Sequence, residues 1–248
     1  MDTNPIHYLP IISTVVAAAF TWVLYHKWKV NRSARYLLWW TIGIALYGLG
    51  TLAESVTTLF GWSEPVFRIW YIAGALLGGA PLATGTVYLL LPKKTADRIA
   101  TALISYIAVA AVLVLVTPVL SELADPNALS GEVIGWRFVR LLSPLINLYA
   151  VIFLIGGALW SAWSYWRRGN APSRVLGNIL IAAGAILPGV GGGFARAGVV
   201  EVLYVAELIG LILIWMGFRV ITHDDVRSIY VTQQIANDAS PQSFAESH

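Results

Sequence analysis

Three ionisable side chains lie well inside stretches of sequence that are otherwise apolar. They are Glu54, Arg140 and Glu207. A charged side chain at the depth of a bilayer costs about 2.5–3.5 kcal/mol on insertion scales unless it is paired or hydrated. We therefore expect these residues to face the interior of a helix bundle, where carboxylate and guanidinium groups bind polar ligands or pair with one another.

Further polar side chains recur at helical spacing around these three. Arg137 and Arg140 share a stripe with Asn147. Glu201, Tyr204 and Glu207 open the seventh apolar stretch at intervals of about one turn. Together they predict a hydrated ligand pocket in one half of the bundle. Its candidate ligand-binding residues are Glu54, Arg68, Tyr71, Arg137, Arg140, Asn147, Tyr204 and Glu207.

The same arginines allow a purely structural interpretation. Arg68, Arg137 and Arg196 lie close to the ends of their apolar stretches, so their long side chains can reach the lipid headgroups. Arg–Glu pairs can also simply hold the helices together. Glu54, Arg140 and Glu207 lie deeper, and this interpretation explains them less well.

Residue types that would support familiar cofactor chemistry are missing or misplaced. All four lysines lie between apolar stretches, so the seventh stretch offers no amine for a retinal Schiff base. The four histidines lie at the ends of stretches or in the tails, and the chain has no cysteine. This leaves no ligand set for haem or a metal. There is also no G-x-S-x-G elbow and no P-loop, so we expect neither a cofactor nor enzymatic activity.

The composition explains why the polar residues are best placed in a bilayer. Of the 248 residues, 58% are hydrophobic and 12% are charged, and the mean hydropathy is +0.71. Soluble domains carry about 25% charged residues, so a soluble globule is excluded. The basic residues lie between apolar runs, a pattern typical of membrane proteins and not of nucleic-acid binding.

Seven apolar stretches are long enough to cross about 30 Å of hydrocarbon. They comprise residues 8–25, 36–60, 66–91, 99–120, 136–165, 175–193 and 200–221. The breaks between them are short, which makes consecutive helices antiparallel neighbours. The sequence therefore predicts an all-α, seven-transmembrane, up-and-down helix bundle over residues 1–222. A short, partly disordered cytoplasmic tail is expected over residues 223–248.

The distribution of positive charge sets the predicted orientation. Most of the 16 Lys and Arg residues fall on one side of the bundle: Lys27, Lys29, Arg32, Arg35, Lys93, Lys94, Arg98, Arg167, Arg168, Arg174, Arg219 and Arg227. The positive-inside rule places this side in the cytoplasm. We therefore expect a multi-pass protein of the cell (inner) membrane, with its N-terminus outside and its C-terminus in the cytoplasm.

Small residues and prolines indicate where the helices pack and bend. Gly74 and Gly78 form a G-x-x-x-G pair in the third stretch. Pro81, Pro144 and Pro188 lie inside the third, fifth and sixth stretches, where each removes a backbone hydrogen bond. The glycine-rich run after Pro188 favours tight packing and a compact last turn. The alternative is a locally broken helix that lines a cavity, as in transporters.

Segments 47–54 and 67–75 contain Glu54 and Arg68 within glycine- and aromatic-rich sequence. They resemble the corresponding segments of uncharacterised bacterial seven-helix proteins. With seven spans, short loops and a polar outer half, the chain also resembles the membrane sensor regions that precede histidine kinases or cyclase domains in many bacteria. The resemblance implies a sensing function. Since only 26 residues follow Thr222, it also implies that a separate protein supplies the output.

These observations favour a membrane-embedded sensor or ligand-binding protein. The predicted outer half contains four arginines and three glutamates, and therefore a positive excess. The arginines are Arg68, Arg137, Arg140 and Arg196, and the glutamates are Glu54, Glu201 and Glu207. This excess predicts a small anionic or amphiphilic ligand that enters from outside. A secondary transporter of a small solute is one alternative. An accessory or structural subunit of a membrane complex, binding lipid or a carotenoid, is another. The expected partners are the bilayer, this ligand and a separate cytoplasmic or membrane signalling protein, with no nucleic acid.

The predicted orientation is testable because the chain has no cysteine that would give a background signal. Single cysteines at Ser63, Asn127 and Ser173 can be labelled in intact cells with a membrane-impermeant thiol reagent. The first two should react from outside, and the third should react only after the membrane is opened. The reverse pattern would overturn the orientation.

Overall fold

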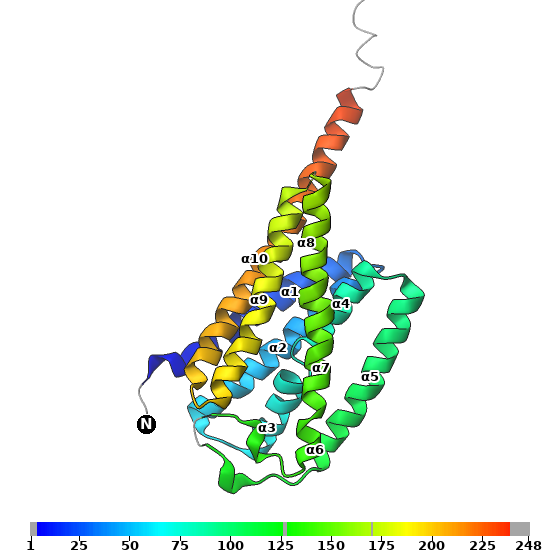
Figure 1. The fold of residues 1–248 in the computed structure, drawn as a ribbon. Helices are drawn as coiled ribbons and strands as arrows, with labels where there is room; N and C mark the ends of the chain where they lie inside the picture. The colour runs from blue at the N-terminus through cyan, green and yellow to red at the C-terminus, as the bar shows by residue number, and fades with distance from the viewer. Residues whose placement is uncertain (1–3, 126–127, 170, 239–248) are drawn as a thin grey trace, which may run out of the picture.

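The structure, a computed structural model, describes residues 4–125, 128–169 and 171–238. Every long element within these ranges is a helix, and seven helical segments are long and apolar enough to cross a membrane. They comprise Pro5–Val30, Arg35–Phe60, Glu64–Leu90, Lys93–Val116, Arg137–Arg168, Pro172–Arg196 and Val200–His223. The prediction of an all-helical chain with seven membrane-spanning segments is confirmed (Figure 1).

Five of the seven segments are built on one uninterrupted α-helix. These helices are α1 (Leu9–Val30), α2 (Arg35–Phe60), α5 (Lys93–Val116), α9 (Pro172–Arg196) and α10 (Val200–Asp238). A 3-10 turn, η1 (Pro5–Tyr8), leads into α1. The largest side-by-side contacts join α9 to α10 and α1 to α2, as expected for helices connected by short loops.

The third and fifth segments each contain a π-helical stretch near their middle, and in the third segment turn residues 77–79 follow it. The third consists of α3 (Glu64–Trp70), a π-helical stretch η2 (Tyr71–Leu76) and α4 (Ala80–Leu90). The fifth consists of α6 (Arg137–Arg140), α7 (Leu142–Ala150), a π-helical stretch η5 (Val151–Gly156) and α8 (Gly157–Arg168). Single π-turns inside helices are rare and often occur at functional sites.

The three prolines differ in their effect on the helices. Pro81 lies in the first turn of α4, and Pro144 lies in the first turn of α7, where a missing N–H leaves no hydrogen bond unmade. Pro188 lies inside α9, which nevertheless continues to Arg196. The helix break considered for this proline is therefore absent, and the π-helical stretches lie in the third and fifth segments instead.

The fourth segment ends four residues earlier than the sequence predicts. Helix α5 stops at Val116 because Thr117 turns to an extended conformation before Pro118. A loop with two 3-10 turns, η3 (Ser121–Leu123) and η4 (Gly131–Val133), follows and closes this end of the bundle. An isolated antiparallel bridge between Val119 and Ile134 holds the described part of the loop together.

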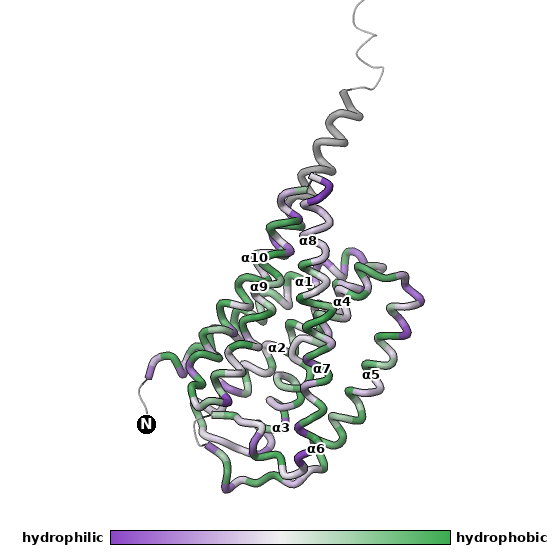
Figure 2. Tube along the Cα trace, viewed as in Figure 1, coloured by the Kyte–Doolittle hydropathy of each residue, from purple (hydrophilic) through white to green (hydrophobic). Residues whose placement is uncertain are grey.

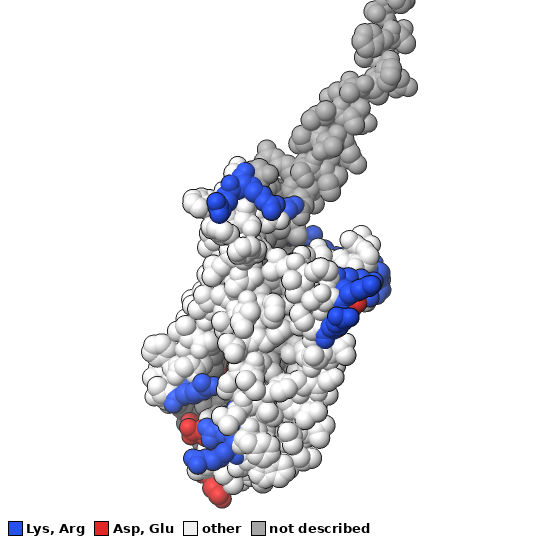
Figure 3. Space-filling view, turned by 45° about the vertical axis from the view of Figure 1, so that its right-hand side comes forward, with Lys and Arg blue, Asp and Glu red and all other residues white. Residues whose placement is uncertain are grey.

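Polarity is arranged as a membrane requires. Hydrophilic residues gather at the ends of the helices in Figure 2, with mostly apolar or neutral residues between them. Figure 3 shows Lys and Arg at two separated levels of one face, with a wide uncharged band between. We call the end that contains residues 31–34, 91–92, 169 and 171 the basic end, and the end that contains residues 61–63, 117–125, 128–136 and 197–199 the opposite end.

Helix α10 passes beyond the bundle at the basic end (Figure 1). It continues without a break past Thr222 to Asp238, so the boundary expected at residue 222 is not marked by a change of secondary structure. The last part of the predicted disordered tail, residues 239–248, lies outside the described residues.

Two glycine pairs bring α9 and α10 into backbone contact. A Cβ added at Gly184 would lie 2.5 Å from the carbonyl oxygen of Gly210, and one at Gly210 would lie 2.6 Å from the carbonyl oxygen of Gly184. Gly177 and Gly217 repeat this arrangement two turns away, with corresponding distances of 2.8 and 2.5 Å. Because lipid offers no hydrophobic driving force between helices, such close packing is what holds this pair together.

Replacing Gly184 with alanine should push α9 away from α10 and destabilise the protein by about 1–3 kcal/mol. The matched control is Gly192→Ala in the same helix, where a Cβ would meet nothing within 4 Å. This control should be neutral or slightly stabilising, because alanine is the better helix former. Thermal unfolding of both variants in one detergent measures the difference, and equal stability would contradict the close-packing account.

Candidate functional site

Two carboxyl groups from distant parts of the sequence meet inside the bundle. Glu54 on α2 and Glu207 on α10 lie within hydrogen-bonding reach of each other. Glu54 is 3% exposed, and its Oε1 accepts a 2.9 Å hydrogen bond from Nε1 of Trp70. Oε2 of each glutamate is buried and has no hydrogen-bond donor in the described part of the chain. We call these two residues the carboxyl pair.

Close helix packing positions Trp70 against the carboxyl pair. One turn before Glu54 on α2, a Cβ at Gly50 would lie 3.2 Å from Cα of Gly74 in the π-helical stretch η2. This contact draws the third segment against α2. Trp70 is the last residue of α3, immediately before the interruption, and it reaches Glu54 from there. The broken helix therefore lies beside the carboxyl pair.

Two tyrosines hold the other side of the pair. Oη of Tyr47 donates a 2.9 Å hydrogen bond to the backbone carbonyl of Glu207, which fixes α2 against α10 at this level. Tyr204 is 2% exposed and lies near both carboxyl groups. Glu201, Tyr204 and Glu207 follow one another at intervals of three on α10, so the stripe predicted from the sequence leads into the bundle.

His7 is a polar residue of this region that sequence reasoning missed. Its ring lies 3.3 Å from a carboxylate oxygen of Glu201 and makes an edge contact with Tyr204. Its backbone carbonyl accepts a hydrogen bond from Thr58. The His7 and Glu201 side chains are 13% and 33% exposed. On α10, Glu201 precedes Glu207 by six residues, about 9 Å along the helix axis. The available signal in the sequence was that His7 lies at the start of the first apolar stretch and Glu201 at the start of the seventh.

Arg68 has a structural role at the opposite end of the bundle. It donates hydrogen bonds to the backbone carbonyls of Val114 and Thr117, and it pairs with Glu64 one turn earlier at 2.7 Å. The carbonyls at the end of a helix have no partners within the helix, so this arginine caps the end of α5. It does not reach Glu54 or Glu207.

The other predicted arginines lie on the surface. Arg137, Arg140, Asn147 and Arg196 are all exposed. The expectation that Arg140 faces the interior is therefore wrong, and the stripe it forms with Asn147 faces outward. Tyr71 is buried, but its hydroxyl accepts a hydrogen bond from Ser143 in a neighbouring cluster.

The electrostatic balance of the site differs from the predicted one. In the described ranges, no Arg, Lys or His forms an ion pair with Glu54 or Glu207. The expected arginine partners are thus absent, and of the predicted site residues only Tyr204 accompanies the carboxyl pair. No group of three His, Cys, Asp or Glu residues suited to a metal ion occurs among the described residues.

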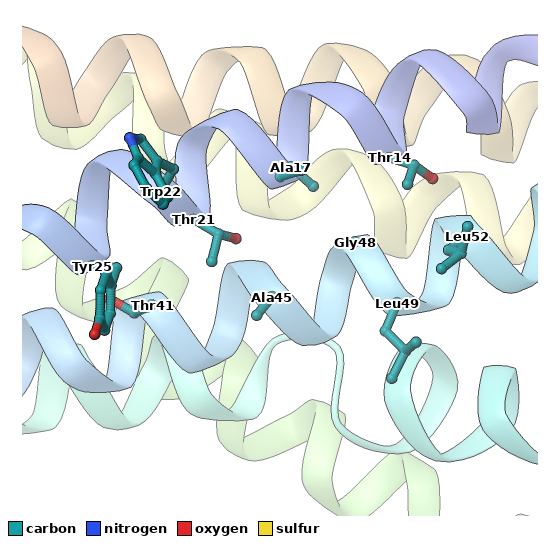
Figure 4. A pocket seen from close by; sticks show the side chains of 11 residues that line it. Thr14, Ala17, Thr21, Trp22, Tyr25, Thr41, Ala45, Gly48, Leu49 and Leu52 are labelled. Atoms are coloured by element: carbon teal, nitrogen blue, oxygen red, sulfur yellow. The ribbon is translucent and has the colours of Figure 1, made fainter.

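A separate apolar groove lies on the side of the bundle between α1 and α2. It has a volume of about 450 Å³ and is lined mainly by alanine, leucine and aromatic side chains, together with three threonines. Trp22 and Tyr25 lie toward one end of the groove in Figure 4, and Thr14 and Leu52 lie toward the other. Such a groove accommodates a hydrocarbon chain and does not contain the carboxyl pair.

Comparison with known proteins adds no relative: no family model, no curated protein and no solved structure matches this chain.

The Trp70–Glu54 hydrogen bond can be tested with a closely matched pair of substitutions. Trp70→Phe should destabilise the protein by about 1–3 kcal/mol, because a buried carboxylate oxygen loses its donor. Trp62→Phe is the control. Its ring also packs on Phe67, with 6.2 Å between ring centres against 6.1 Å for Trp70. Its Nε1, however, is buried without a hydrogen-bond partner among the described residues. Chemical unfolding in detergent should show the smaller loss for Trp62→Phe, and equal losses would assign the effect to packing alone.

Proposed function

We propose that this chain is a membrane-embedded sensing or binding protein whose site is the carboxyl pair, and that the site takes a proton or a small cation. The observation that carries the proposal is the buried, donor-free Oε2 of Glu54 beside Glu207. Two adjacent negative charges away from water repel each other and lose their hydration. A shared proton or a bound cation removes this cost. The proposed chemistry is reversible binding, with no covalent step.

The ligand charge in this proposal differs from that expected from the sequence. A small anionic or amphiphilic ligand was expected because arginines outnumber glutamates in the predicted outer half. Arg137, Arg140 and Arg196 are exposed. Arg68 already donates hydrogen bonds to backbone carbonyls at the end of α5. The interior of this half therefore carries negative and not positive groups, which supports a cationic ligand.

We further propose that the carboxyl pair opens to the outside of the cell membrane. The positive-inside rule assigns the basic end to the cytoplasm, which puts the N-terminus and the partly exposed pair His7–Glu201 outside. Helix α10 carries Glu207 and runs on beyond the bundle at the basic end as one helix to Asp238. This continuity supports the transmission of a change at the site to a separate signalling protein.

A secondary transporter is the second candidate function. It is favoured by the third segment, where turn residues 77–79 separate η2 from α4, because discontinuous helices next to polar groups are typical of transporter binding sites. The π-helical stretch η2 begins directly after Trp70, and η5 packs against α4 of the same broken segment. A lipid- or carotenoid-binding accessory subunit is favoured instead by the groove between α1 and α2.

Equilibrium binding of radioactive Na⁺ to the full chain in lipid nanodiscs, with proton exchange followed by a pH indicator, tests the proposal. Wild-type protein should bind Na⁺ or exchange about one proton per chain at the carboxyl pair. Glu54→Gln and Glu207→Gln should each abolish this signal. The control Arg140→Glu should retain it, because Arg140 is exposed on another helix.

The other outcomes separate the alternatives. If Arg140→Glu loses the signal and both glutamine variants keep it, the carboxyl pair is not the site. This result would support the anionic ligand expected from the sequence instead. Parallel measurement of Na⁺ and proton flux in proteoliposomes distinguishes transport from sensing. Flux that depends on Glu54 and Glu207 would identify a transporter.

A further inference from the structure

A polar cavity lies at the basic end, far from the carboxyl pair and separate from the apolar groove. It has a volume of about 440 Å³, within the range of small-ligand sites. It lies between the loop that precedes α2 and the start of α5. The side chains that line it include Arg32, Arg35, Tyr36, Tyr88 and Lys93. We call it the basic cavity.

The basic cavity keeps an excess of positive charge. Asp97 pairs with Arg35 and accepts a 2.6 Å hydrogen bond from Tyr88, so it offsets one of the three cations. Neither Arg32 nor Lys93 forms an ion pair in the described part of the chain. Arg35 uses one of its guanidinium nitrogens for Asp97, and an arginine has five N–H donors.

The surroundings favour an anion that lies at the membrane surface. The guanidinium of Arg32 lies 4.0 Å from the ring centre of Trp28, which fixes it where aromatic side chains meet lipid headgroups. Helices α2 and α5 both begin at this cavity, and neither start is capped by a side chain. Their first turns contain no acidic residue, so the positive ends of both helix dipoles add to the charge of the side chains.

We propose that the basic cavity binds a phosphate group, carried by the headgroup of an anionic phospholipid. A guanidinium group offers directional hydrogen bonds to phosphate oxygens, and an ammonium group offers a compact positive charge. Phosphate-binding sites use both. Basic pockets between membrane helices are suited to such headgroups. Because the cavity lies at the level where the spanning segments end, a lipid phosphate reaches it without leaving the bilayer. This inference does not depend on the carboxyl pair.

The test uses the full chain in nanodiscs of phosphatidylcholine, with and without phosphatidylglycerol, and counts retained lipid by native mass spectrometry. The wild type should retain phosphatidylglycerol in preference to phosphatidylcholine. Arg32→Gln and Lys93→Gln should each weaken this preference about fivefold, as expected for one cation at a membrane surface. Arg35 is left unchanged because its pairing with Asp97 links α2 to α5.

Arg167→Gln is the matched control. Arg167 lies at the same basic end and also stacks on a tryptophan, with its guanidinium 4.9 Å from the ring centre of Trp163, but it does not line the basic cavity. This variant should retain phosphatidylglycerol as the wild type does. If Arg167→Gln and Arg32→Gln lose the preference for phosphatidylglycerol equally, the preference comes from general attraction to the basic surface. That result would overturn the site.

A second arm distinguishes the source of the phosphate. In nanodiscs of phosphatidylcholine alone, the thermal stability of the protein is compared in sodium phosphate and in sodium chloride of equal ionic strength. No difference between the salts, with preferential retention of phosphatidylglycerol, supports the lipid. Stabilisation by inorganic phosphate that is lost in Arg32→Gln, without any lipid preference, would overturn the lipid assignment. No response to either ligand would overturn the site.

Discussion

The cost of holding two carboxyl groups away from water, with no ion pair to a Lys, Arg or His among the described residues, is the constraint around which this bundle is organised. Glu54 and Glu207 come from helices that are far apart in the sequence, and each leaves one oxygen without a donor. One surrounding contact supplies part of the missing solvation, because Trp70 donates to a carboxyl oxygen of Glu54. Tyr47 bonds the backbone carbonyl of Glu207 and so positions that residue without solvating its carboxyl group. What these contacts leave unbalanced is charge, and a proton or cation is the simplest way to balance it.

The packing of the helices serves this arrangement. Gly50 and Gly74 allow α2 and the third segment to approach closely, which brings Trp70 to the carboxyl pair. On the other side, α9 contacts α10 through glycines, so the helix that carries Glu207 is held by its backbone. The interruption of the third segment begins directly after Trp70. Rigid packing on one side of the site and an irregular helix on the other are therefore combined in one small region.

The sequence predicted the seven spanning segments because hydrophobic length is a strong signal, and it predicted the stripe that leads from Glu201 to Glu207 because helical periodicity is another. The sequence did not correctly predict which face of a helix turns inward. Arg137 and Arg140 do share a stripe, but that stripe is exposed, and periodicity alone is the same for either direction. It also missed His7, whose partner lies at the far end of the chain, and the π-helical stretches, which depend on tertiary packing.

Infrared spectroscopy of the protonated-carboxyl band, on the full chain in nanodiscs, addresses the state of Glu54 and Glu207 without reference to any ligand or partner. If the pair shares a proton, the wild type shows a buried carboxylic-acid band that shifts in deuterium oxide. The same band should be missing or displaced in both Glu54→Gln and Glu207→Gln, and saturating Na⁺ should remove it if a cation replaces the proton. A spectrum with two ionised carboxylates and no bound cation, or a band that neither substitution changes, would contradict the account.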